Sequence, residues 1–100
     1  MTKRAEQIHM GRVAALGCIV CRKIFYVHSI PEIHHLRTGQ GAGQRASNYD
    51  TIGLCPLHHR LGGYGVAIHA GQKEWEKRYG TETDLLTQTK QLLALEADNA

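Results

Sequence analysis

The sequence predicts an α+β fold in which two short strands lie between helical segments at both ends of the chain. Three observations predict it. Apolar residues recur at helical spacing near both termini, short apolar runs flank a glycine-rich loop, and Cys/His pairs adjoin these runs. The chain has 100 residues, 42% hydrophobic and 6% aromatic. Such a length allows one domain, 1–100, with a thin core that a structural metal would help to stabilise.

The N-terminal segment, 1–16, is predicted to be a helix that runs from Thr2 to Leu16. Its apolar side is expected to consist of Ala5, Ile8, Ala15 and Leu16. Gly17 follows at once, and glycine is a common helix stop. We therefore expect the helix to end directly before Cys18. Farther on, residues 24–30 fit either a short strand or an irregular loop.

The central segment, 17–61, is predicted to contain two strands, Glu32–Leu36 and Thr51–Leu54. Between them, residues 38–47 combine three glycines with polar residues, which is typical of a loop. Pro56 is suited to the first turn of a helix, which we expect to run to about Leu61 before the glycines that follow.

The C-terminal segment, 71–96, is predicted to be helical in two parts. Trp75 and Tyr79 are four residues apart in the first part, which Gly80 ends. Thr81 and Asp84 resemble a capping box that opens the second part. Its apolar stripe is expected to pack against the core, with a partner-binding surface as the alternative: Leu85, Leu86, Leu92, Leu93 and Leu95.

Composition excludes several classes of protein. No apolar run approaches the roughly 18 residues of a membrane span, so no membrane association is expected. The net charge of +3 permits contact with nucleic acid without proving it. Three cysteines cannot pair completely, and no secretory signal precedes them. Both facts favour a reducing cytoplasm and metal ligation over a disulfide framework.

Two short motifs have the spacing of zinc knuckles: Cys18-x-x-Cys21 and Cys55-x-x-His58. Together they predict one tetrahedral Cys3His zinc site, and four protein ligands make such a site structural. Cys18 and Cys21 as buried apolar side chains are the alternative. A redox pair is less favoured, because no βαβ pattern surrounds the motif.

The adjacent pair His34-His35 forms the second candidate site. Neighbouring residues on a strand point to opposite faces, so one histidine could bind a metal while the other faces a substrate. His59 follows His58, and a step of about 100° around a helix would turn it away from the zinc. His34 and His59 could therefore share a second ion with open coordination positions.

These motifs resemble a known family. Residues 32–35 (EIHH), a glycine-rich loop and residues 50–59 (DTIGLCPLHH) look like the HNH nuclease motif, a ββα-metal (His-Me finger) module. The closer resemblance is to phage Ref-type proteins, described as RecA-dependent HNH nucleases. It continues through Arg60, residues 62–65, 69–71 and 79–80, and covers about 14–93.

The resemblance implies a role for each residue that matches the motif. His34 and His59 would be ligands of the catalytic metal, and His35 would be the general base. Asp50 stands where the family has a central Asn that orients the base, with Asn48 two residues away. Glu32 matches an acidic residue that supports the active site.

Many HNH proteins have a further metal ligand four residues after the first one on the helix, and that position is Gly63 here. His69 is therefore the expected replacement ligand, with a buried hydrogen-bonding role as the alternative. The expected cofactors are a structural Zn²⁺ and a second divalent metal (Mg²⁺, Mn²⁺ or Zn²⁺). Candidate phosphate ligands are Arg37, Arg45 and Arg60, for which solvated surface charge is the alternative.

The resemblance further implies a DNA substrate, a RecA filament as partner, a phage or prophage origin and the cytoplasm of a bacterial host. The predicted activity is metal-dependent hydrolysis of phosphodiester bonds that leaves 5′-phosphate and 3′-hydroxyl ends. A second hypothesis is a zinc-stapled module that binds DNA or protein without catalysis. The intact histidines His34, His35 and His59 favour the enzyme, because a structural module needs only the knuckle ligands.

Overall fold

A computed structural model describes residues 3–41 and 43–99. Its regular elements are α1 (Lys3–Leu16), β1 (Glu32–His35), β2 (Thr51–Leu54), α2 (Gln72–Tyr79) and α3 (Glu82–Asn99). Short helical turns are formed by Cys21–Phe25, Leu57–Leu61 and Ile68–Ala70. The predicted α+β class is therefore confirmed. Thr2, the expected first residue of the N-terminal helix, lies outside the described residues.

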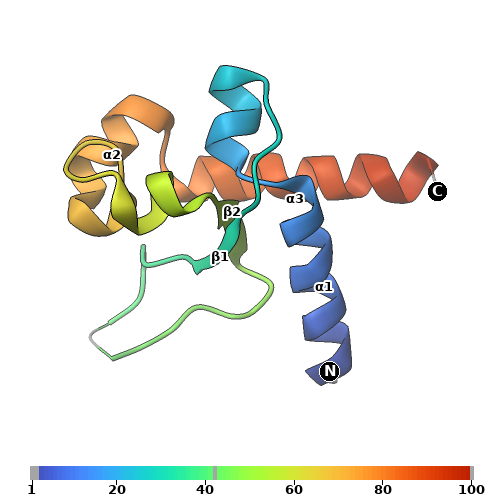
Figure 1. The fold of residues 1–100 in the computed structure, drawn as a ribbon. Helices are drawn as coiled ribbons and strands as arrows, with labels where there is room; N and C mark the ends of the chain where they lie inside the picture. The colour runs from blue at the N-terminus through green and yellow to red at the C-terminus, as the bar shows by residue number, and fades with distance from the viewer. Residues whose placement is uncertain (1–2, 42, 100) are drawn as a thin grey trace.

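The sheet consists of β1 and β2, which pair antiparallel with His34 opposite Ile52 and His35 opposite Thr51. Both predicted strands are confirmed, although β1 ends at His35, one residue early. All four residues of β2 are buried. Helices α1 and α3 both contact this strand, and Figure 1 shows α1 beside the sheet and α3 crossing behind it.

The buried residues of helix α1 lie in its last turn, and farther toward the N-terminus the His9 ring contacts Tyr49 (ring centres 4.9 Å apart). Val13 and Leu16 are buried against Leu93 of α3, and the Arg12 guanidinium donates a hydrogen bond to the Leu93 carbonyl (2.8 Å). The expected apolar side is mostly wrong, because Ala5, Ile8 and Ala15 are exposed. The first turns of α1 extend beyond the sheet, as Figure 1 shows, so an apolar residue there has no surface to pack against.

Gly17 ends α1 as predicted. Its φ of 82° lies in the left-handed region, and an added Cβ would come within 2.9 Å of the Ser29 carbonyl oxygen. Only glycine fits this close approach. The chain then forms a π-helical turn, Cys21–Phe25, followed by an irregular segment, so the strand considered for residues 24–30 is wrong.

The C-terminal helices pack around Trp75, which is fully buried. The Thr81 hydroxyl accepts a hydrogen bond from the Asp84 N–H (3.1 Å), which confirms the predicted cap of α3. Leu85 and Leu93 belong to the core, but Leu95 is 58% exposed and its expected packing is wrong. Among the described helices, none is long and apolar enough to cross a membrane.

Candidate metal centres and catalytic cleft

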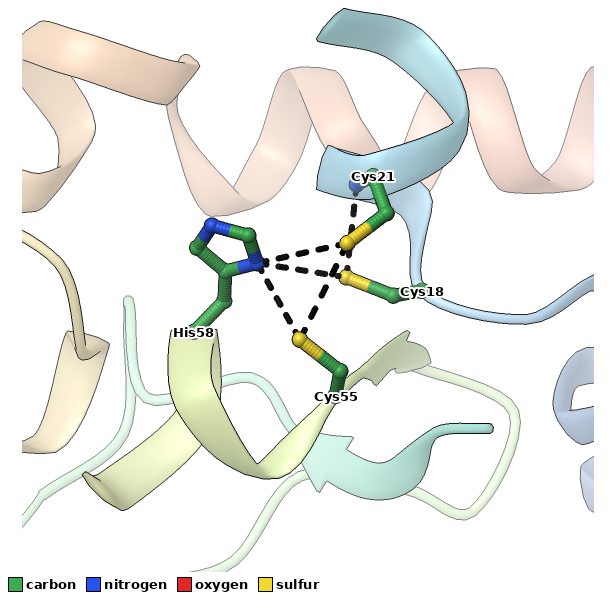
Figure 2. Close-up of side chains that lie close together, drawn as sticks. All are labelled: Cys18, Cys21, Cys55 and His58. Atoms are coloured by element: carbon green, nitrogen blue, oxygen red, sulfur yellow. Dashed lines mark hydrogen bonds between the residues drawn. The ribbon is translucent and has the colours of Figure 1, made fainter. Parts of the chain in front are cut away.

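The four knuckle residues come together in one buried cluster. Cys18 follows Gly17, Cys21 begins the turn Cys21–Phe25, Cys55 follows β2, and His58 lies in the turn Leu57–Leu61. Their side chains are at most 8% exposed. Figure 2 shows the three sulfur atoms and the His58 Nδ1 pointing toward one another.

The spacing of these atoms matches a tetrahedral shell. With Zn–S bonds of about 2.3 Å and a Zn–N bond of about 2.0 Å, the S···S edge is about 3.8 Å and the S···N edge about 3.5 Å. The Cys21 and Cys55 sulfurs are 3.8 Å apart, and the His58 Nδ1 lies 3.6 Å from the Cys21 sulfur. Its distances to the other sulfurs are 3.7 Å for Cys18 and 3.2 Å for Cys55. The cluster is therefore sized to hold a metal ion.

Electrostatics in this cluster also favour a cation. Burial raises the pKa of the Cys18 thiol to about 12, and burial lowers the pKa of His58. A buried thiolate needs a positive charge beside it, whereas a neutral imidazole is the form that binds metals. The apoprotein would thus keep these groups uncharged, and a bound cation would take up the negative charge of the thiolates.

A second cluster is formed by His34, His59 and His69, which could also hold a metal ion. They come from β1, the turn Leu57–Leu61 and the turn Ile68–Ala70. The His59 and His69 Nε2 atoms are 2.9 Å apart, and the His34 ring centre lies 5.1 Å from that of His59. As the sequence predicted, His58 and His59 face different clusters although they are neighbours in the chain.

Glu32 supports this cluster from β1. Its carboxylate lies 2.8 Å from the His59 Nδ1 and accepts three hydrogen bonds from Arg60 at 2.7, 2.9 and 3.1 Å. These bonds, first from Arg60 and then from His59, lower the pKa of Glu32 to about 2. An ionised Glu32 accepts a hydrogen bond from the His59 Nδ1–H. The His59 Nε2 then keeps its lone pair, which is directed toward His69.

Glu82, the first residue of α3, supports His34 in a similar way. One carboxylate oxygen lies 2.6 Å from the His34 Nε2, and both side chains are buried. Burial raises the pKa of Glu82, but the hydrogen bonds from His34 and Thr38 outweigh it and lower the value to about 2. The sequence analysis missed Glu82, because nothing in residues 81–84 beyond the capping pattern marks a buried charge.

His69 is exposed, and its pKa is lowered first by partial removal from water and then by the nearby charges of His59 and His34. A lowered pKa keeps the imidazole neutral near pH 7, as a metal ligand requires. The structure thus brings His69 into contact with the other two histidines, although no sequence spacing places it there.

On the other side of β1, His35 faces a cleft of about 480 Å³ beneath the glycine-rich loop. Arg37 and Arg45 line this cleft, together with Gln40, Gln44 and Gln72. The His35 Nε2 lies 2.8 Å from the Asn48 Oδ1, and one Arg45 guanidinium nitrogen lies 2.8 Å from the His35 Nε2 and 3.3 Å from its Nδ1. Of the three predicted phosphate ligands, two therefore share the cleft with His35, while Arg60 pairs with Glu32.

Asp50 does not make the contact expected of it. The backbone carbonyl of Asp50 accepts a hydrogen bond from Leu36, and its carboxylate lies 3.3 Å from the Lys90 ammonium of α3. The residue that contacts His35 is Asn48. The reason is the position of β2: pairing of Asp50 with the end of β1 turns its side chain toward α3, whereas Asn48 stays in the loop.

The fold and the two clusters define the class of protein: a small α+β domain that presents a buried Cys/His metal-type centre beside a cluster of three histidines. The particular family follows from comparison with family models. Residues 3–94 match the model of the recombination enhancement, RecA-dependent nucleases, and the chain belongs to this family. No curated protein matches the chain. The family name indicates a nuclease that is functionally linked to RecA, as the resemblance implied.

Proposed function

We propose that the protein is a metal-dependent endonuclease of the HNH, ββα-metal type, which hydrolyses DNA phosphodiester bonds during recombination in a phage or prophage. The observation that carries this proposal is that two adjacent histidines on β1 face different sites. His34 belongs to the histidine cluster, and His35 faces a cleft lined by arginines. A scissile phosphate over this edge of β1 would meet both groups.

His35 is the proposed general base, and Asn48 orients it. The Asn48 Oδ1 can only accept a hydrogen bond, so once Arg45 has moved from the His35 ring onto a bound phosphate, the His35 Nε2 carries the proton and donates to Asn48. The Nδ1 then keeps its lone pair, which can take a proton from water near neutral pH. In the free protein the Arg45 guanidinium occupies the space beside the His35 ring, 2.8 Å from Nε2 and 3.3 Å from Nδ1. A bound phosphate would draw Arg45 toward itself and open that space to the attacking water.

The two clusters fit two different metals. The closed Cys3His shell suits a structural Zn²⁺, as its tetrahedral edges indicate. His34, His59 and His69 would hold a second divalent ion, Mg²⁺, Mn²⁺ or Zn²⁺, whose positive charge stabilises the phosphate and the departing 3′ oxygen. Three imidazoles would leave coordination positions free for substrate oxygen atoms.

Arg37 and Arg45 are the proposed phosphate ligands, because both are exposed and line the cleft with His35. Arg60 has a different first role in this proposal. The Arg60 guanidinium donates hydrogen bonds to both carboxylate oxygens of Glu32. Arg60 therefore fixes the carboxylate that orients His59. Phosphate binding by Arg60 would require that pair to open.

Plasmid nicking tests the proposal. The protein is incubated with supercoiled DNA and Mg²⁺, Mn²⁺ or no added metal, with and without RecA filaments. The expected result is metal-dependent cleavage to 5′-phosphate and 3′-hydroxyl ends, which His35→Ala abolishes and His28→Ala, a change at an exposed histidine, does not. Products with 3′-phosphate ends would contradict the mechanism. If wild type and His35→Ala both bind DNA and neither cleaves it, the chain is the binding module of the second hypothesis.

A further inference from the structure

The Glu82 carboxylate has more hydrogen-bond partners than a helix N-cap or a surface ion pair would have. Its carboxylate is fully buried at the start of α3, yet it contacts a histidine that lies 48 residues earlier in the chain. A buried carboxylate is costly unless hydrogen bonds compensate its charge. The arrangement of those bonds shows what the residue does for the histidine cluster.

The two oxygens of Glu82 have separate partners. Oε1 accepts hydrogen bonds from the backbone N–H of Arg37 (2.9 Å), the N–H and hydroxyl of Thr38 (2.8 and 2.7 Å) and the side-chain amide of Gln72 (3.3 Å). Oε2 contacts only His34 among these groups, at 2.6 Å. Oε1 therefore attaches α3 to the end of β1 and to α2, and Oε2 is reserved for the imidazole.

The donors on Oε1 determine the state of the His34 ring. They compensate the negative charge of the carboxylate, which then can only accept a hydrogen bond. The His34 Nε2 must carry the proton, and Nδ1 is the nitrogen left with a lone pair. A carboxylate behind a histidine ligand fixes the tautomer and the ring orientation of metal-binding histidines in this way.

We propose that Glu82 is a positioning residue that holds His34 as the Nε2–H tautomer and presents its Nδ1 to the cluster with His59 and His69. This inference rests on the proposed function for its purpose, since a presented Nδ1 serves a second metal. Glu32 does the same for His59 with the opposite nitrogen, because it contacts Nδ1 and leaves Nε2. The cluster is thus oriented by two carboxylates from different elements, Glu32 of β1 and Glu82 of α3.

The substitution Glu82→Gln tests the orientation without changing the shape of the side chain. The N–H groups of Arg37 and Thr38 need an acceptor, so the glutamine oxygen must take the place of Oε1. Its NH2 group then faces His34 and donates to Nε2. The His34 proton should move to Nδ1, which removes the lone pair from the cluster. Glu76→Gln is the matched control, because the Glu76 carboxylate accepts a bond from the Glu82 N–H and does not contact His34.

The direct measurement is the tautomer of His34, read from long-range ¹H–¹⁵N spectra of the protein with its first cluster loaded with zinc. We expect Nε2–H in wild type and in Glu76→Gln, and Nδ1–H in Glu82→Gln. An Nδ1–H tautomer in wild type would overturn the inference, and so would an unchanged tautomer in folded Glu82→Gln. If the variant does not fold, the wild-type spectrum alone decides.

A Mn²⁺ titration gives the second readout. The affinity of the histidine cluster should fall about 10- to 100-fold in Glu82→Gln, the usual effect of losing a carboxylate behind a histidine ligand, and stay unchanged in Glu76→Gln. Equal Mn²⁺ affinity in wild type and Glu82→Gln would contradict the inference. The nicking assay remains separate. If wild type does not cleave DNA, the proposed function fails, while the tautomer and the titration still decide the role of Glu82.

Discussion

Substitution of His58 by Ala should remove the structural zinc and unfold the protein, whereas the same change at His59 should leave the zinc in place. The two residues are adjacent in the turn Leu57–Leu61, but they face different clusters. His58 is buried with the three cysteines, and His59 contacts Glu32 and His69. The pair therefore separates the two metal sites with a matched change on one turn.

The expected magnitude follows from the size of the domain. Structural zinc contributes about 10–16 kcal/mol of apparent binding energy in small modules. A domain of this size typically has a total stability of about 5–15 kcal/mol. Loss of even about 5 kcal/mol would lower Tm by at least about 20 °C, since each kcal/mol corresponds to roughly 4–8 °C in a domain of 60–100 residues. His58→Ala should thus be largely unfolded at 37 °C.

Zinc content by mass spectrometry and thermal melting by circular dichroism check this prediction. Wild type should carry a zinc ion that survives dialysis, His59→Ala should retain it with a nearly unchanged Tm, and His58→Ala should lack it. A His58→Ala protein that lacks zinc and still melts like wild type would refute the reasoning. A zinc-free wild type that is folded would refute it as well.

Three further predictions concern the cleft and the carboxylates. Asn48→Ala should lower kcat by about 10- to 100-fold, the usual range for loss of a residue that orients a histidine, whereas Asp50→Asn should have little effect. Steady-state nicking rates of the two variants check this prediction. A larger loss in Asp50→Asn than in Asn48→Ala would return the orienting role to Asp50. Arg37→Ala should weaken DNA binding and reduce the slope of log affinity against the log of salt concentration by about 1. Fluorescence anisotropy measures both quantities. An unchanged slope would mean that Arg37 contacts no phosphate. The pKa of Glu82 is lowered from 4.5 to about 2 on folding, so its stabilising effect is complete above pH 4.5 and is lost as the pH falls toward 2. The difference in unfolding free energy between wild type and Glu82→Gln should therefore be constant from pH 7 to 5 and shrink below 4.5 in urea titrations, and a difference that grows toward acid would contradict the sign.

The features that the sequence predicted well depend on short-range geometry. Two-residue spacing determines that both side chains of a knuckle can reach one ion, so the cluster of Cys18, Cys21, Cys55 and His58 follows from the motifs alone. The opposite facing of His34 and His35 follows from the alternation of side chains along a strand. Local spacing accounts for each knuckle and for the facing of each strand residue, whereas the meeting of the two knuckles, 34 residues apart at Cys21 and Cys55, was inferred from the need for four ligands.

Several features that depend on distant packing were predicted wrongly or were missed. Helical periodicity identified an apolar side for α1 and α3, but it does not tell how much of a helix reaches the core, so Ile8 and Leu95 are exposed. The contact between Glu82 and His34 depends on where α3 begins relative to β1. The choice between Asn48 and Asp50 depended on the residue at which β2 begins, and a shift of two positions there changes which side chain meets His35.

The turn Leu57–Leu61 connects the two clusters physically. The Gly62 N–H donates to the Leu57 carbonyl at 2.9 Å, a five-residue closure that ends the turn before the glycines. Cys55 and His58 fix the beginning of this turn through the first cluster, and His59 extends from it into the second. A zinc ion in the Cys3His shell would therefore hold the backbone that places His59 beside His69. On the proposed function, the convergence of the three histidines would therefore depend on metal binding in the first cluster, in a domain that has no large core around them.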